Sequence, residues 1–186
     1  MKKCSLWIIL LFIFSGCSGT PDELQTGMEL RSRVLQASGC TFDAEIKADY
    51  GDEIHTFSME CSVDSKGMLN YKVTGPETIS GITGTVSGDG GKLTFDETAL
   101  CFPLMADGQA SPISAPWILM QMLRTGYIAS ACKEEGKIRL SIDDNLDEKP
   151  LRVDLWLNME ELPVHADILY DGRRILSVSV DNFRLL

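Results

Sequence analysis

The sequence predicts an α+β fold in which a long, curved, mostly antiparallel sheet forms an open, unclosed β-barrel. An N-terminal helix precedes the sheet, and a central apolar helix lies on its concave side. Three patterns carry this prediction: helical spacing of apolar residues over 20–37, apolar and polar alternation over most later segments, and an almost wholly apolar stretch at 114–125. A sheet this long must curl, and its concave face then needs an apolar filling.

The first sixteen residues have the pattern of a signal peptide. A pair of lysines precedes an apolar run at 6–14, which is too short to span a bilayer stably, and small residues lead directly to Cys17. This is the lipobox pattern that a lipoprotein signal peptidase cleaves. We therefore expect removal of residues 1–16 and attachment of diacylglycerol to Cys17, which palmitate would label. An ordinary secretory signal cleaved elsewhere is the alternative, and it also exports the protein.

The mature chain is expected to consist of a short tether, residues 17–20, and a single domain, residues 21–186. Without the two signal-peptide lysines it carries 15 basic and 27 acidic side chains, a net charge of −12. This charge argues against a nucleic-acid partner and against attraction to anionic lipid headgroups. The expected location is extracytoplasmic, held by lipid to the outer face of the cytoplasmic membrane, or to the outer membrane in a diderm cell.

The first helix is expected to begin at Thr20, because Glu23 completes a capping box and Pro21 suits the first turn. Ser38-Gly39 supplies its end. One stripe of the helix carries Leu24, Met28, Arg31 and Leu35, and Leu30, Val34 and Ala37 lie beside it.

Two alternating segments flank Tyr50-Gly51 and predict a hairpin. With these two residues as the tip, Cys40 lies directly opposite Cys61 in a non-hydrogen-bonded pair, where Cα atoms approach to about 4.5 Å, within disulfide range. Export leaves four cysteines in the domain, and four thiols permit three pairings. The register favours Cys40–Cys61, which leaves Cys101–Cys132 by elimination. Four unpaired, buried thiols are the alternative.

The later segments complete the expected sheet. Further strands are expected over residues 68–74, 79–87, 92–95, 98–104, 127–133, 137–142, 151–158, 164–170 and 173–185. Glycines at 81 and 84 suggest a bent or bulged strand, and 143–149 is expected to be an acidic loop. The helix at 114–125 is apolar on nearly every side, so it should be enclosed, with Gly126 at its C-terminal cap.

No catalytic residue, metal site or cofactor is predicted. His55 and His165 lie in expected strands, His55 in the inward register, and neither has zinc-ligand spacing. There is no nucleophile elbow and no phosphate-binding loop. The acidic loop lacks the spacing of an EF-hand and is expected to be solvated. We therefore expect a protein that is not an enzyme.

The order of elements resembles the lipoprotein-carrier superfamily of LolA and LolB, over nearly all of residues 21–186. The local matches are the Asp-Gly-Lys-like turn in 88–96 and the terminal hairpin formed by 162–164 and 171–172. The chain is also similar to the small lipoproteins of the GerS type and to mycobacterial lipid-binding lipoproteins. It departs from LolA in its own lipid anchor and in its four additional cysteines.

The resemblance implies a protein that binds a lipid, an acyl chain or lipidated cargo in a hydrophobic concave cavity. The expected lining residues are Phe42, Ile46, Phe57, Met59, Trp117, Met120 and Met122. Methionine side chains give an adaptable wall for flexible chains. The alternative for these side chains is that they pack against one another as core. The alternative for the protein is a non-enzymatic accessory or regulatory partner of an exported cell-envelope enzyme.

Overall fold

The computed structural model describes residues 21–49, 53–106, 109–146 and 148–186. The expected signal peptide, Cys17 and the tether lie outside these residues. The helices are α1 (Pro21–Gln36), α2 (Ala115–Thr125) and two single-turn 3₁₀ helices, η1 (Glu77–Ile79) and η2 (Pro112–Ser114). The strands are β1 (Gly39–Asp49), β2 (Ile54–Asp64), β3 (Leu69–Gly75), β4 (Thr83–Ser87), β5 (Gly90–Phe95), β6 (Thr98–Phe102), β7 (Met105–Ala106), β8 (Gln109–Ala110), β9 (Tyr127–Glu134), β10 (Lys137–Leu146), β11 (Lys149–Leu157), β12 (Pro163–Tyr170) and β13 (Arg173–Leu185).

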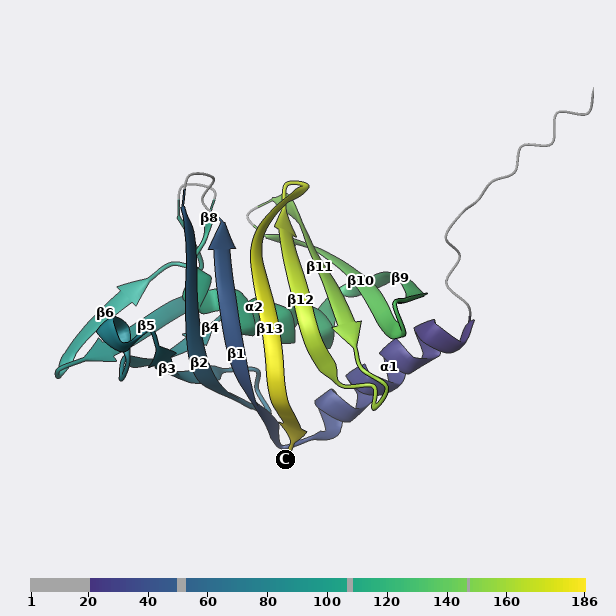
Figure 1. Cartoon of the computed structure of the whole chain (residues 1–186), viewed down its shortest axis with the longest axis horizontal. Helices are drawn as coiled ribbons and strands as arrows, with labels where there is room; N and C mark the ends of the chain where they lie inside the picture. The colour runs from purple at the N-terminus through teal and green to yellow at the C-terminus, as the bar shows by residue number, and fades with distance from the viewer. Residues whose placement is uncertain (1–20, 50–52, 107–108, 147) are drawn as a thin grey trace, which may run out of the picture.

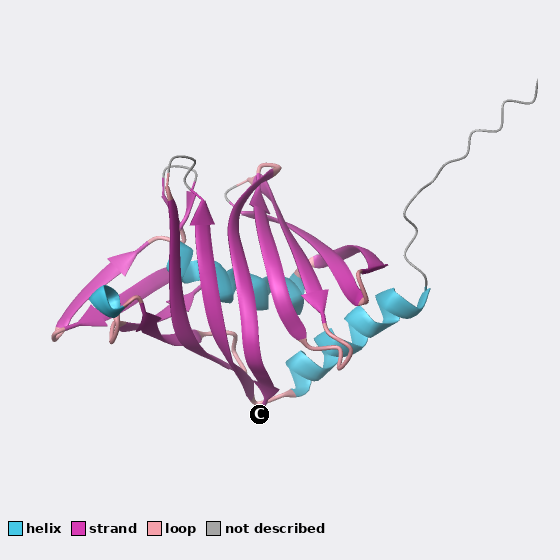
Figure 2. Ribbon diagram, viewed as in Figure 1, coloured by secondary structure: helices cyan, strands magenta, loops and turns pink. Residues whose placement is uncertain are grey.

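Eleven of these strands form one antiparallel sheet in the order β6-β5-β4-β3-β2-β1-β13-β12-β11-β10-β9. The sheet consists of two meanders, β1–β6 and β9–β13, which are joined where β1 pairs with β13. It curves without closing, and α2 lies across its concave side (Figure 1). Figure 2 shows the same arrangement by element type, with α1 beside the β9 end. The predicted fold class, an open barrel with an N-terminal and a central helix, is confirmed.

Helix α1 packs on the sheet through one side of the predicted apolar surface, the side of Leu30 and Val34. Glu23, Gly27, Leu30 and Val34 face inward, whereas the apolar members of the predicted stripe, Leu24, Met28 and Leu35, are exposed. The reason is Gly27, where an added Cβ would lie 2.9 Å from Cδ2 of Leu140. The missing side chain allows α1 to approach β10 closely, and this contact decides which stripe is buried.

Helix α2 agrees closely with the prediction. Its buried side chains are Ala115, Pro116, Trp117, Ile118, Leu119, Met120, Met122 and Leu123, and Gly126 follows as the C-cap. A helix buried on so many sides is stable because it fills the hollow of the sheet.

Two predicted segments were wrong. Residues 79–87 do not form one bent strand, because η1 and a turn at Gly81, with φ of +91°, precede β4. Residues 143–149 are not an open loop, because β10 continues to Leu146 and β11 begins at Lys149. The bidentate pair of Arg152 with Asp143, at 2.6 and 2.9 Å, neutralises one of the acidic side chains and favours the longer hairpin.

The β1–β2 hairpin also has a different register. Asp49 pairs with Ile54, so four residues rather than two connect the strands, and each predicted partner is displaced by two. Alternation has a period of two and is unchanged by such a shift, which is why the inward face was predicted correctly while the opposed residues were not.

Candidate ligand-binding face of the sheet

The concave face of the sheet is apolar from β13 to β6. One row of directly paired residues runs across six strands of this face: Phe42, Cys61, Tyr71, Gly84, Leu93 and Leu100. Its first three members are buried, and burial raises the pKa of Tyr71 to about 12. The row gives a continuous apolar track that begins beneath α2 and ends at the sheet edge.

Polar bonds hold α2 against this face at both ends. The Trp117 indole Nε1 donates to the carbonyl of Gly67 at 3.1 Å, and Arg124 Nη2 donates to the carbonyl of Ser65 at 2.8 Å. From α1, Arg31 donates through Nε to the Leu123 carbonyl at 2.7 Å and through Nη2 to the Gly126 carbonyl at 2.6 Å. These bonds satisfy carbonyls at the C-terminal end of α2, which lack partners inside the helix.

Six of the seven predicted lining residues lie in the core between the sheet and α2. Phe57 is the exception and is half-buried. The buried six are Phe42, Ile46, Met59, Trp117, Met120 and Met122. Sheet and helix therefore bring the predicted set together, and in this arrangement the buried side chains belong to one hydrophobic core. Their role in ligand binding stays a prediction.

The uncovered part of the apolar face lies beyond α2, on β5 and β6. Leu100 is 58 % exposed and Phe95 is 53 % exposed, and both point to the concave side. Large apolar side chains that lie adjacent and solvent-exposed mark interaction surfaces. The lining prediction missed this end, because the alternation in 92–95 and 98–104 indicates which side chains share a face and not which of them are exposed.

Cys40, Cys61, Cys101 and Cys132 form no disulfide in the structure. Cys40 pairs with Val63 and Cys61 with Phe42, so the predicted directly opposed pair was wrong, and the two cysteines are diagonal neighbours. Cys101 and Cys132 lie on β6 and β9, at opposite edges of the sheet, so their predicted pairing was wrong as well. Burial raises the pKa of Cys40 to about 11 and also raises that of Cys61.

The two histidines have different surroundings. His55 keeps the predicted inward register, because it pairs with the buried Ala48, but its side chain is exposed and lies 3.2 Å from a Glu53 carboxylate oxygen. His165 is partly buried, as predicted, and its Nε2 lies 3.3 Å from Asp167. Burial raises the pKa of Asp167, but hydrogen bonds from His165, Ser177 and Arg174 outweigh this and lower it to about 2.

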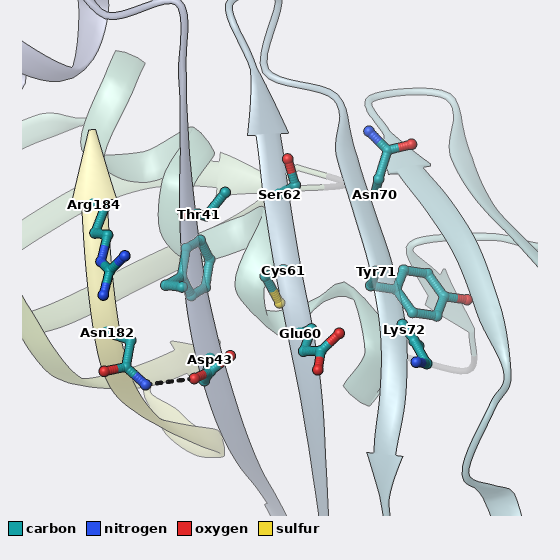
Figure 3. A pocket seen from close by; sticks show the side chains of 11 residues that line it. Thr41, Asp43, Glu60, Cys61, Ser62, Asn70, Tyr71, Lys72, Asn182 and Arg184 are labelled. Atoms are coloured by element: carbon teal, nitrogen blue, oxygen red, sulfur yellow. Dashed lines mark hydrogen bonds between the residues drawn. The ribbon is translucent and has the colours of Figure 1, made fainter. Parts of the chain in front are cut away.

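The outer, convex face has a separate polar hollow of about 660 Å³ over β13, β1, β2 and β3 (Figure 3). The polar side chains that line it are Thr41, Asp43, Glu60, Ser62, Asn70, Lys72, Asn182 and Arg184. Asp43 lies between two other carboxylates, because it pairs with Glu60 on β2 and with Asp181 on β13. Like charges in directly opposed positions destabilise a sheet. Within the hollow, Asn182 donates to Asp43 at 2.7 Å.

The part of the chain that the structure describes was compared with two patterns, a group of metal-ligating side chains and a helix that could cross a membrane. Within them, no three His, Cys, Asp or Glu side chains are grouped as metal ligands. None of the helices in this part of the chain has the length and hydropathy needed to cross a bilayer.

Neither a protein-family model nor a curated protein matches the sequence. Solved structures do match, and two of them with TM-scores above 0.5 share this fold, in agreement with the fold expected from the order of elements. A DUF1329 family protein from Desulfovibrio piger shares 10 % identity and a TM-score of 0.51, with 90 % of this chain and 93 % of that chain covered. A domain described as an outer membrane lipoprotein-sorting protein, from Vibrio parahaemolyticus, shares 9 % identity and a TM-score of 0.51, covering 88 % and 92 %. A LolA superfamily protein from Nitrosomonas europaea shares 9 % identity and a TM-score of 0.45, covering 87 % and 93 %. At these identities the likeness concerns the fold alone.

Proposed function

We propose that this protein is an extracytoplasmic lipoprotein, anchored through lipid on Cys17, that binds an acyl chain or another lipidic ligand against its concave face. The lipobox pattern at residues 14–17 supports the anchor. The LolA-like fold is compatible with the binding role, but a fold alone does not define a function. The binding role therefore rests on the chemistry of the face itself.

One observation carries the proposal: the apolar row of the concave face continues past α2 and ends uncovered. Phe42 and Tyr71 are buried in this row, whereas Leu100 at its far end is more than half exposed. An acyl chain lying over Leu100 and Phe95 would remove apolar surface from water, which is favourable at about 25 cal/mol per Å². The ligand would extend the packing that α2 provides in the middle of the sheet.

A ligand could contact either the exposed side chains at the sheet edge or the buried side chains beneath α2, and the structure distinguishes the two. Contact with Leu100 and Phe95 needs no rearrangement, because both side chains already face solvent. Contact with the six buried residues of the predicted lining requires α2 to move, and the bonds made by Trp117, Arg124 and Arg31 oppose this. We place the first contact of the ligand at the β5–β6 end.

The test is to purify the full chain from its native membrane and identify bound lipid by native mass spectrometry and extraction. Phe95→Glu should abolish co-purification of lipid, since a carboxylate would be placed in the apolar track. Thr94→Glu is the matched control, because Thr94 is the next residue of β5 and points to the other face. Equal lipid content in the two variants, or none in the wild type, would overturn the binding role.

The anchor is tested separately. Labelled palmitate should mark the wild-type protein, and Cys17→Ser should abolish the label and release the protein from the membrane fraction. An unlabelled wild type would remove the anchor from the proposal and leave the lipid-binding test unaffected.

A second function, as accessory partner of an exported envelope enzyme, is favoured by the outer face. The carboxylates of Asp181, Asp43 and Glu60 lie in one row across three strands, an arrangement that a cationic partner surface would stabilise. Asp43→Asn together with Glu60→Gln should then weaken a pull-down from native membranes. Unchanged recovery of every partner would exclude this face as the docking site.

A further inference from the structure

The two edges of the large sheet are protected to different extents. At one edge, β9 packs against α1 and carries charged residues, including Lys133, whose Nζ lies 3.5 Å from Glu23. At the other edge, β6 has the sequence Thr-Ala-Leu-Cys-Phe, with no charge and no proline, and its first four residues are exposed. Natural sheets protect exposed edges with charges, prolines or a covering element. The backbone groups of an unprotected edge strand can pair with those of another strand.

The groups that this edge offers follow from the β5–β6 hairpin. Phe95 and Thr98 flank a two-residue turn, in which Asp96 and Glu97 both have positive φ, as a type I′ turn requires. Counting outward from the turn, hydrogen-bonded and non-hydrogen-bonded pairs alternate, so Leu100 pairs its backbone groups with β5. The N–H and C=O groups of the residues on either side of it, Ala99 and Cys101, then point away from β5. Among the described residues, no hydrogen bond to these outward groups is found.

We propose that β6 is a homodimer interface, in which the β6 strands of two copies pair antiparallel about a two-fold axis at Leu100. In this register Ala99 of each copy exchanges two backbone hydrogen bonds with Cys101 of the other, so all outward groups of both residues are satisfied. Leu100 faces its own counterpart in a non-hydrogen-bonded pair, where side chains approach closely. Shifting the axis to Cys101 would place Ala99 opposite Pro103, which has no N–H to donate.

Charge and shape identify a second copy as the occupant. Two mature chains, each with a net charge of −12, repel one another, and pairing through β6 adds no contact between like charges because this strand carries none. Figure 1 places β6 at the end of the molecule opposite α1 and β9. An antiparallel pair is self-complementary, as a two-fold interface demands. The apolar concave faces of the two copies would then join at Leu100.

Cysteine crosslinking of the full chain tests the register. In a Cys101→Ser background, Leu100→Cys places two thiols in a non-hydrogen-bonded pair about 4.5 Å apart at Cα, within disulfide range. Mild oxidation of native membranes should give a disulfide-linked species of twice the mass. Tyr127→Cys in the same background is the matched control, because Tyr127 is 73 % exposed on the other edge strand. The Leu100→Cys protein should crosslink at least about tenfold more than the control, since pairing fixes the thiols at high effective concentration.

A second measurement does not depend on introduced thiols. Light scattering of the purified full chain in detergent should give a dimer that Leu100→Lys converts to a monomer, while Tyr127→Lys has no effect. A wild type that stays monomeric, equal crosslinking at both edges, or crosslinking of Leu100→Cys to a different protein would each overturn the proposal. Lipid content and palmitate labelling are read independently, so failure of the dimer is distinguishable from failure of the proposed function.

Discussion

Arg31 links α1 to the C-terminal end of α2, and the loss of this link should be measurable. Arg31 makes two hydrogen bonds from a charged donor, at 2.7 and 2.6 Å, to carbonyls at the C-terminal end of α2. A hydrogen bond to a charged group contributes about 1.5–3 kcal/mol, but the site is only part-buried, so water replaces part of what is lost. We expect Arg31→Met to lower the free energy of unfolding by about 2 kcal/mol, since methionine keeps the length of the side chain and removes its donors.

The assay is urea-induced unfolding followed by tryptophan fluorescence, with the slope of the transition checked for two-state behaviour. Arg33→Met is the matched control on the same helix, because the Arg33 guanidinium makes exposed contacts with Glu161, at 3.3 Å to its carbonyl and 3.5 Å to its carboxylate. Such a surface pair contributes at most about 1 kcal/mol. If Arg31→Met and Arg33→Met destabilise the protein equally, the reasoning that Arg31 fastens α2 to α1 is refuted.

Three further predictions concern other parts of the molecule. The pKa of Asp167 is lowered from 3.8 to about 2, so its carboxylate stabilises the fold above about pH 4 and this stabilisation disappears as the pH falls towards 2. Asp167→Asn should therefore cost about 1–2 kcal/mol at pH 7 and almost nothing at pH 2 in urea titrations; an equal cost at both would contradict the assignment. Gly84→Ala should destabilise by at least about 2 kcal/mol because its Cβ would overlap the Lys92 carbonyl and the Tyr71 hydroxyl, while Gly88→Ala, with nothing within 4 Å, should be neutral in the same thermal assay. A thiol reagent at pH 8 should modify exposed Cys101 long before Cys40, whose burial and pKa of about 11 suppress the thiolate; early labelling of Cys40 in mass spectrometry would be inconsistent with this core.

Alternation and length limited what the sequence could predict about the hairpins. The pattern in β1 and β2 identified the inward residues correctly, because side chains on a strand alternate whatever the pairing. The number of residues in the connection set the register, and no pattern in 50–53 distinguishes a two-residue from a four-residue loop. The predicted Cys40–Cys61 opposition depended on that loop and was wrong for this reason. Reduction tests a diagonal bridge between them, since forming one removes two hydrogens from the intact mass.

The sequence predicted which residues gather around the central helix, but it did not predict which part of the apolar face is left uncovered. The apolar character of 114–125 indicated a buried helix over a concave sheet, and the residues expected around it do gather there. The part of the eleven-stranded sheet that the eleven-residue helix α2 covers depends on where the helix lies on the sheet. The exposure of Phe95 and Leu100 follows from that placement, so the sequence alone did not distinguish them from core residues.

By itself, the sequence determined the strand and helix periodicities, the enclosed central helix and the curved, open architecture. These are local properties, governed by composition and spacing along the chain. The tertiary structure decided which stripe of α1 is buried, which residues oppose one another across β1 and β2, and where the apolar face is left uncovered. Each of these depends on contacts between distant segments, such as Gly27 against Leu140, whose geometry no short stretch of sequence contains.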